Sequence, residues 1–159
     1  MAPSTEPFDD MPVLDKHVPG ERYRAFLESM PQVCVEVVLE TERGILLAKR
    51  VNHPEVWFWP GSRLYKGEPV RAAVTRVAKE ELGIAVDIRE PLGVYAHFWE
   101  AAGGEPSRHT VNLPYRAVPA DPPVEISLDD QHEDYRFVTQ VEGWMHEYVR
   151  QYLTDGNLV

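Results

Sequence analysis

Residues 57–84 read WFWPGSRLYKGEPVRAAVTRVAKEELGI, and this stretch decides the fold. Its three leading aromatic residues favour a strand, which Pro60-Gly61 breaks into a glycine-bearing loop. Apolar residues then recur, mostly at spacings of three and four, up to Leu82, and this period predicts a helix. Gly83 is a typical helix stop. We therefore expect a strand, a loop and a helix in direct succession.

Two acidic residues, Glu80 and Glu81, fall in the last turn of that predicted helix. Acids at a helix C-terminus oppose the macrodipole, so they are mildly unfavourable there. A hard cation would offset this cost, since Mg²⁺ takes oxygen ligands from carboxylates. The alternative is a solvated acidic turn in which Arg76 pairs with Glu80, four residues away, and contributes little. Spacing alone leaves both interpretations open.

The same stretch resembles the Nudix box, G-x5-E-x7-R-E-U-x-E-E-x-G-U, where U is an aliphatic residue. The positions that match are Glu68, Arg76, Ala78, Glu80, Glu81, Gly83 and Ile84. Two positions depart, because Ser62 replaces the box glycine and Val77 replaces the glutamate that follows the arginine. In ordinary Nudix pyrophosphatases this helix face carries several carboxylates, which hold more than one metal ion. The resemblance implies a Nudix-type α/β/α sandwich with a mixed sheet, and the missing acid at Val77 implies fewer metal ions.

The rest of the chain predicts further strands and helices around this motif. We expect a helix at 21–30, strands at 33–39, 45–51, 85–88, 93–99, 110–118 and 135–138, and a last helix that starts near Glu142. Prolines within residues 1–19 predict an extended N-terminal arm, and residues 20–159 are expected to form a single domain. Strands with a central and a terminal helix favour a mixed sheet sandwiched by helices.

Composition excludes several kinds of partner. The net charge of −10 argues against nucleic acid, because no basic excess is present to release counterions. No apolar run approaches the length of a membrane span, and residues 1–20 lack the features of a signal peptide, so a cytoplasmic protein without a membrane partner is expected. Cys34 has apolar neighbours and is expected to be a buried thiol. The chain has 26 acidic and 16 basic residues, and only four of the basic residues are lysines. This composition suggests a surface suited to high salt.

A second informative segment, LDDQHEDYRF, spans residues 128–137. Histidine is the side chain best suited to accept a proton near neutral pH, and the neighbouring acids could support His132 as a base. The alternative interpretation is a solvated acidic loop before a strand.

From Val33 to Thr139 the chain resembles the GDP-mannose mannosyl hydrolase family, a Nudix relative. The matching segments, in order, are LLAKR at 46–50, WFWPGSR at 57–63, GVYAHF at 93–98, His109 and DDQHEDYRF at 129–137. The resemblance implies hydrolysis of the glycosidic C–O bond of a nucleoside diphosphate sugar, with GDP-mannose as the leading substrate, and a homodimer. That family also lacks the glutamate at the position of Val77, whereas Glu80 and Thr110 depart from its pattern.

The resemblance also implies roles for individual residues. One Mg²⁺ (or Mn²⁺) would be held by the Gly61 carbonyl, Glu81 and Gln131, with Glu80 as a further candidate ligand. The residues expected to be catalytic are His132, as the general base, and Arg50, Arg63 and Arg76, which would neutralise the departing diphosphate. The residues expected to bind substrate are Glu36, Arg50, Arg63 and His97. For the arginines a surface role is the alternative, and for His97 it is core packing.

Two other functions compete with this hypothesis. A conventional Nudix pyrophosphohydrolase would release a nucleoside monophosphate and a sugar phosphate, and Glu80 favours it. A non-catalytic nucleotide-sugar sensor would keep the fold without turnover, and Ser62 is the feature in its favour.

Overall fold

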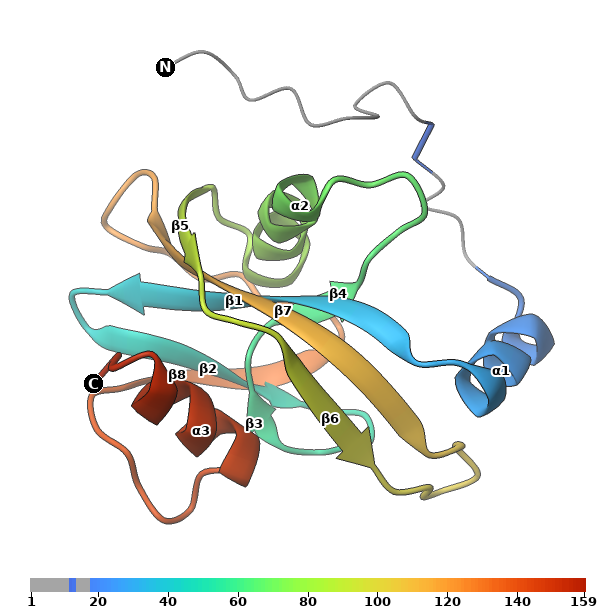
Figure 1. Ribbon diagram of the computed structural model, residues 1–159. Coiled ribbons are helices and arrows are strands. Elements are labelled where there is room, and N and C mark those ends of the chain that lie inside the picture. Colours follow the sequence, from blue (N-terminus) through green and yellow to red (C-terminus); the bar gives the residue numbers. More distant parts are fainter. Residues whose placement is uncertain (1–11, 14–17) are drawn as a thin grey trace.

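The computed structural model describes residues 12–13 and 18–159 (Figure 1). The elements in chain order are α1 (Gly20–Ser29), β1 (Gln32–Thr41), β2 (Gly44–Arg50), β3 (Trp57–Phe58), β4 (Gly61–Arg63), α2 (Val70–Leu82), β5 (Val86–Pro91), β6 (Tyr95–Trp99), β7 (Arg108–Pro119), β8 (His132–Val138) and α3 (Glu147–Asp155). Most of the predicted arm at 1–19 lies outside the described residues. None of the described helices is long and apolar enough to cross a membrane.

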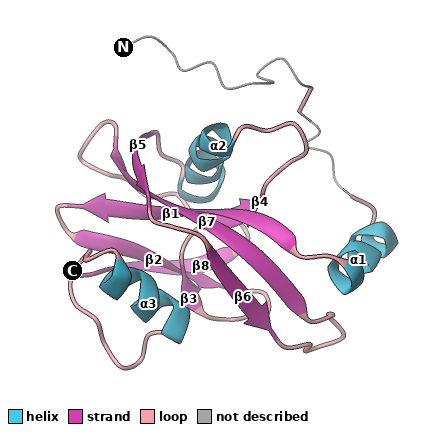
Figure 2. Ribbon diagram, viewed as in Figure 1, coloured by secondary structure: helices cyan, strands magenta, loops and turns pink. Residues whose placement is uncertain are grey.

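The strands form one mixed sheet, as predicted. Within the described residues the order is β3-β2-β1-β7-β5, with β4 beside β1, β6 beside β7 and β8 beside β2. The long central strands β1 and β7 run parallel, and the remaining pairs are antiparallel. Figure 2 shows the helices on the two sides of this sheet, so the predicted α/β/α sandwich is confirmed.

Helix α2 covers one face of the sheet with the residues that the helical period predicted. Ala73, Val74 and Val77 are fully buried against Val35 and Val37 of β1. Gly83 ends the helix in the left-handed conformation, at φ 69°, and its N–H bonds back to the carbonyls of the last turn. Glycine adopts positive φ without a Cβ clash, which is why the chain stops the helix there.

Helix α3 covers the opposite face. Val149 and Tyr152 of α3 pack against Val38 of β1 and against Trp59, whose ring stacks on that of Tyr152. Successive side chains of a strand point to opposite faces, so the odd positions of β1 from Val35 to Leu39 meet α2, while its even positions meet the α3 side. This alternation places Glu36 on the α3 side, where it is buried.

Three expectations about element boundaries were wrong. The last helix begins at Glu147 instead of near Glu142, because the side chain of His146 caps it by accepting the Tyr148 N–H at 3.2 Å. The last strand begins at His132 instead of Tyr135, because it pairs with β2 as far as Arg50. Residues 61–63, expected to be loop, form β4 against β1.

Candidate active site

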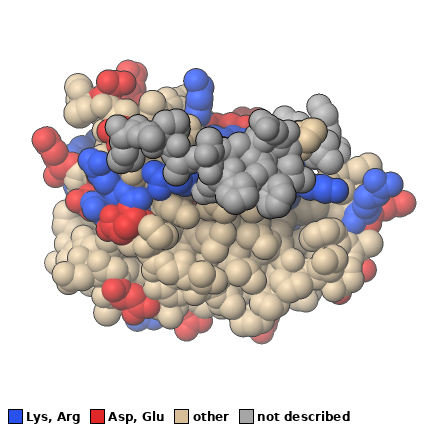
Figure 3. All heavy atoms as spheres, turned by 45° about the horizontal axis from the view of Figure 1, so that its top comes forward, with Lys and Arg blue, Asp and Glu red and all other residues tan. Residues whose placement is uncertain are grey.

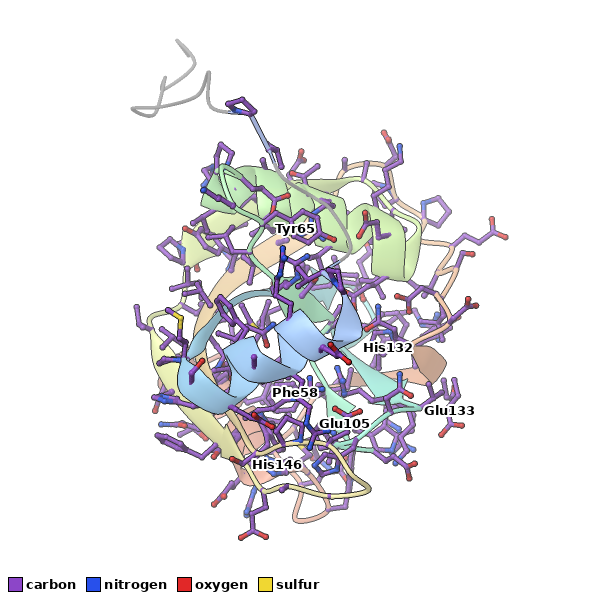
Figure 4. The ribbon with its side chains drawn as sticks, turned by 90° about the vertical axis from the view of Figure 1, so that its right-hand side faces the viewer. Phe58, Tyr65, Glu105, His132, Glu133 and His146 are labelled. Carbon is purple, nitrogen blue, oxygen red and sulfur yellow. The ribbon has the colours of Figure 1, made fainter. Side chains whose placement is uncertain are left out.

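A cavity of about 250 Å³ opens at one end of the sheet, and we call it the inner cavity. Six residues predicted to be functional line it: Glu36, Arg50, Gly61, Arg63, His97 and Gln131. The fold thus brings together residues from β1, β2, β4, β6 and the loop before β8. Figure 4 views this region from the α1 side and labels Phe58, another lining residue, and His132.

The parallel register of β1 and β7 builds the wall of the inner cavity. Gln32 lies opposite Thr110, and Cys34 lies opposite Asn112, so alternate positions of both strands point to the same side. Cys34 therefore lines the inner cavity and is half-buried, whereas a buried thiol was expected. Burial and the nearby Glu36 raise the pKa of its thiol to about 12, so the thiol stays protonated and unreactive.

The floor of the inner cavity is a buried polar cluster. Nδ1 of His97 lies 3.9 Å from Oε1 of Glu36, and Nε2 of His97 lies 3.3 Å from the hydroxyl of Tyr152. The His97 ring also stacks on Tyr148 at 4.0 Å between ring centroids. His97 thus packs in the core and faces the cavity at once, so the two interpretations of this residue do not exclude each other.

Burial decides the protonation states in this cluster. Desolvation raises the pKa of Glu36 to about 8, so its carboxyl is neutral at pH 7. Desolvation lowers the pKa of His97 to about 4, so its imidazole is neutral as well. Oε2 of Glu36 has no hydrogen-bond partner in the described part of the chain. The floor therefore offers an uncharged polar surface with an unused hydrogen-bonding atom.

Glu81 and the segment before β8 form an acidic corner beside the inner cavity. The N–H of Gly61 lies 3.4 Å from Oε1 of Glu81, and Nε2 of His132 lies 3.7 Å from the same oxygen. A Cβ at Gly61 would come within 2.9 Å of the Val35 carbonyl oxygen, so only glycine fits between this corner and β1.

The acidic corner suits a divalent cation. Glu81, Asp129 and His132 each offer a ligand atom, and these atoms lie within 4.8 Å of one another. Oε2 of Glu81 is buried and has no hydrogen-bond partner within residues 12–13 and 18–159. Burial and the nearby Asp129 raise the pKa of Glu81 to about 8, and a cation would offset that cost. The side-chain nitrogen of Gln131 lies 3.3 Å from Asp129, so its amide adjoins the group.

His132 is held by an acid that the sequence analysis did not single out. Nδ1 of His132 lies 2.8 Å from Oδ1 of Asp129, and the imidazole is almost fully buried. This contact places the ring proton on Nδ1 and leaves the lone pair of Nε2 available. The acid three residues before the histidine was the available signal, but four acids flank His132 and spacing alone does not choose among them.

Arg76 and Glu80 lie apart from the inner cavity. The guanidinium of Arg76 makes two hydrogen bonds to Glu68, at 2.7 and 3.0 Å, and a third to the carbonyl of Arg63 at 3.1 Å. Arg76 also pairs with Glu80, whose side chain is 57% exposed. These contacts fix the loop before α2. Val77, on the helix face that Glu81 shares, is fully buried in the core.

The chain is similar to proteins of a known family. A family model described as the NUDIX domain matches residues 30–151. The chain belongs to the Nudix family. The predicted enzyme class is confirmed, and the protein is a Nudix hydrolase.

Two curated relatives come from archaea. The low-salt glycan biosynthesis protein Agl8 of Haloferax volcanii is 35% identical over 141 residues, which cover 86% of this chain and 88% of that protein. An ADP-ribose pyrophosphatase of Methanocaldococcus jannaschii is 34% identical over 95 residues, which cover 58% of this chain and 53% of that protein.

Solved structures show the same fold. A MutT NUDIX hydrolase from Burkholderia pseudomallei superposes with a TM-score of 0.64 and is 28% identical, over 80% of this chain and 98% of that one. The MutT protein of Methanosarcina mazei gives a TM-score of 0.66 at 18% identity, over 81% and 95% of the two chains, and supports the fold alone.

Proposed function

We propose that this Nudix hydrolase cleaves the glycosidic C–O bond of a nucleoside diphosphate sugar, with GDP-mannose as the leading substrate. One observation carries the proposal, namely that the Asp129–His132 pair lies against the Glu81 carboxylate beside the inner cavity. The 3.7 Å between Nε2 of His132 and Oε1 of Glu81 supports a base and a cation ligand that act on the same bond.

His132 is the proposed general base. Its Nε2 accepts a proton from a water molecule, and the water oxygen forms a bond to the anomeric carbon of the sugar. The bond from that carbon to the diphosphate oxygen breaks, and the electron pair leaves with the nucleoside diphosphate. Direct attack by water inverts the anomeric configuration. Asp129 holds the imidazole in the tautomer that this step needs.

The leaving diphosphate carries charge that the site must balance. A divalent cation held by Glu81, with Gly61 and Gln131 as further proposed ligands, would neutralise part of it. Arg50 and Arg63 line the inner cavity and supply guanidinium groups, which pair with phosphate oxygens. Arg76 is already bound to Glu68 and acts by positioning the loop that carries Arg63.

The position of Val77 supports one cation instead of several. α2 offers a single carboxylate to the acidic corner, because Val77 lies in the core and Glu80 points outward to Arg76. With one cation, the pyrophosphate bond has less support for attack than in a site that carries more carboxylates. This difference favours cleavage at the sugar carbon.

Hydrolysis of GDP-mannose in ¹⁸O-labelled water tests the proposal. Cleavage of the C–O bond gives GDP, whose two phosphorus signals are coupled, and places ¹⁸O in the free sugar. Cleavage of the pyrophosphate gives two uncoupled monoester signals and places ¹⁸O in a phosphate group. The second pattern would overturn the proposal, as would the absence of turnover across a panel of nucleotide sugars with Mg²⁺ or Mn²⁺.

A conventional pyrophosphohydrolase is the second candidate, and two observations favour it. The box residue Glu80 is present, and a relative named as an ADP-ribose pyrophosphatase shares 34% identity with the chain. The same labelling experiment separates this activity from the first. We also propose that the protein is a cytoplasmic homodimer, and sedimentation velocity of the purified chain would test its assembly.

A further inference from the structure

A second, larger hollow adjoins the inner cavity, and we call it the outer hollow. Its volume is about 720 Å³, and its wall includes the turn of residues 102–105, which a hydrogen bond from Glu105 N to Ala102 O closes at 2.9 Å. Figure 4 shows Glu105 below α1, on the same side of α1 as Phe58 of the inner cavity. Arg50, Arg108 and Gln131 line both spaces, so these three residues mark the junction between them.

Arg108 reaches this junction because of its place in β7. It is the first residue of the strand, and it lies an even number of positions before Thr110 and Asn112, which line the inner cavity. Side chains at alternate positions of a strand point to the same face. Arg108 was not among the predicted site residues, and only the register of β7 with β1 reveals where it points.

The guanidinium of Arg108 has unused hydrogen-bonding capacity. Its Nε is buried and has no hydrogen-bond partner in the part of the chain that the structure describes. One terminal nitrogen lies 3.5 Å from a carboxylate oxygen of Glu105, at the limit of hydrogen bonding. A buried donor without a partner is costly, so an unfilled donor at a cavity wall indicates a ligand acceptor.

Arg108 also lies close enough to Arg50 to repel it. The pKa of Arg50 is lowered, first by burial and then by the charge of Arg108. The Arg50 guanidinium donates from Nε to the carbonyl of Pro54 at 3.2 Å. Two guanidinium groups near each other at the junction of the two cavities favour binding of a group with two or more negative charges.

We propose that Arg108, together with Arg50, binds the diphosphate of the substrate at this junction. The sugar then occupies the inner cavity, next to the acidic corner, and the nucleoside occupies the outer hollow. The larger volume of the outer hollow suits the larger end of the molecule. This inference rests on the proposed function, and it adds a residue and an orientation for the substrate.

The test measures binding of GDP in the presence of Mg²⁺ by titration calorimetry. Arg108→Gln should weaken binding about 10- to 100-fold, because it removes a charge-assisted interaction. Arg89→Gln, an exposed residue of β5, removes the same charge and should bind GDP as the wild type does. Arg108→Lys keeps the charge and should recover part of the affinity, which a merely structural role for Arg108 would not predict.

Guanosine provides a matched ligand without phosphate. Its affinity should be the same for the wild type and Arg108→Gln, whereas a collapsed site would lose both ligands. Equal GDP affinities for the wild type and Arg108→Gln would overturn the inference, and the proposed function would stand if the labelling experiment still gave GDP. A wild-type protein that neither binds nucleoside diphosphates nor cleaves nucleotide sugars would overturn both.

Discussion

Nδ1 of His132 lies 2.8 Å from Oδ1 of Asp129, and this pair turns the other ring nitrogen toward Glu81. A buried histidine with one ring nitrogen fixed by an acid, and with the lone pair of the other nitrogen available, has the geometry of a positioned base. The two residues are three positions apart in one short segment, and the pairing of β8 with β2 at Arg50 holds that segment in place.

Replacement of His132 tests the base directly. His132→Gln should lower kcat about 10²- to 10⁴-fold with little change in KM, since glutamine cannot accept the proton. Asp129→Asn should have a smaller effect, because the imidazole remains but loses the acid that fixes its tautomer. Steady-state kinetics on the identified nucleotide sugar give these values. Asp130→Asn, an exposed neighbour, is the matched control, and a His132→Gln enzyme near wild-type rate would refute the assignment.

Adjacent glutamates of α2 give a matched test of the cation site. Glu81→Gln should abolish the rise in melting temperature that Mg²⁺ or Mn²⁺ produces, because the buried carboxylate is the proposed ligand. Glu80→Gln removes the same charge one residue away, at an exposed position, and should keep the rise. Differential scanning fluorimetry with and without EDTA measures both. If only Glu80→Gln lost the metal response, the cation would bind at the exposed face of α2, and the assignment of Glu81 would be wrong.

A substitution at Val77 measures the free-energy cost of a second acid on the face of α2 that carries Glu81. Val77→Glu should destabilise the protein by at least about 2 kcal/mol, since it buries a carboxylate without a partner in the core. Val77→Ala, which only removes methyl groups, is the control for lost packing. Urea unfolding in EDTA gives the two free energies. A Val77→Glu variant that gains pyrophosphatase activity with Mg²⁺ would support the argument that this position limits the number of cations.

Glu36 should make stability depend on pH. Its pKa is raised from 4.5 to about 8 in the folded protein, so the folded state binds more protons than the unfolded state between these values. The stabilisation is complete below pH 4.5 and is lost as pH rises through 8, by up to about 5 kcal/mol. The free energy of unfolding of the wild type, compared with that of Glu36→Gln in EDTA, should therefore fall from pH 5 to pH 8.5. Equal pH slopes for the two proteins would show that the carboxyl titrates normally.

The acidic composition makes a prediction about salt. Figure 3 shows acidic and basic side chains around the margins of one face, and the whole chain carries a net charge of −10. Salt screens repulsion between like charges, so the unfolding midpoint should rise between low and molar KCl. Thermal melts in KCl measure this rise. A midpoint that stays constant or falls would exclude adaptation of the surface to high salt.

The helix of the box and its glycine stop could be predicted because both depend on local chemistry. The period of α2 and the left-handed Gly83 are properties of neighbouring residues. The start of β8 could not be predicted, because the polar run at 132–134 becomes strand through its pairing with β2. Likewise α3 begins late because the side chain of His146 forms its cap.

The candidate site likewise contains residues that the sequence could predict and residues whose positions depend on long-range contacts. Six predicted residues line the inner cavity, and the resemblance of the segments that carry them had singled them out. Arg108 has no motif, because its role depends on the register between β1 and β7, which pair across a long stretch of sequence. The contacts of Arg76 with Glu68 depend on the path of the loop before α2, so spacing favoured only its weaker partner Glu80.

The cluster of Glu36, His97 and Tyr152 has a consequence for folding kinetics. Glu36 and Tyr152 are more than 100 positions apart, yet both lie against His97, with Glu36 Oε1 3.9 Å from its Nδ1 and the tyrosine hydroxyl 3.3 Å from its Nε2. Contacts of such high sequence separation form late, because the chain must first close the loops between them. A folding intermediate with α2 docked on β1 would already present Glu81, but its cavity floor would still be missing. Recovery of ligand binding after dilution from urea should therefore lag behind recovery of helical signal.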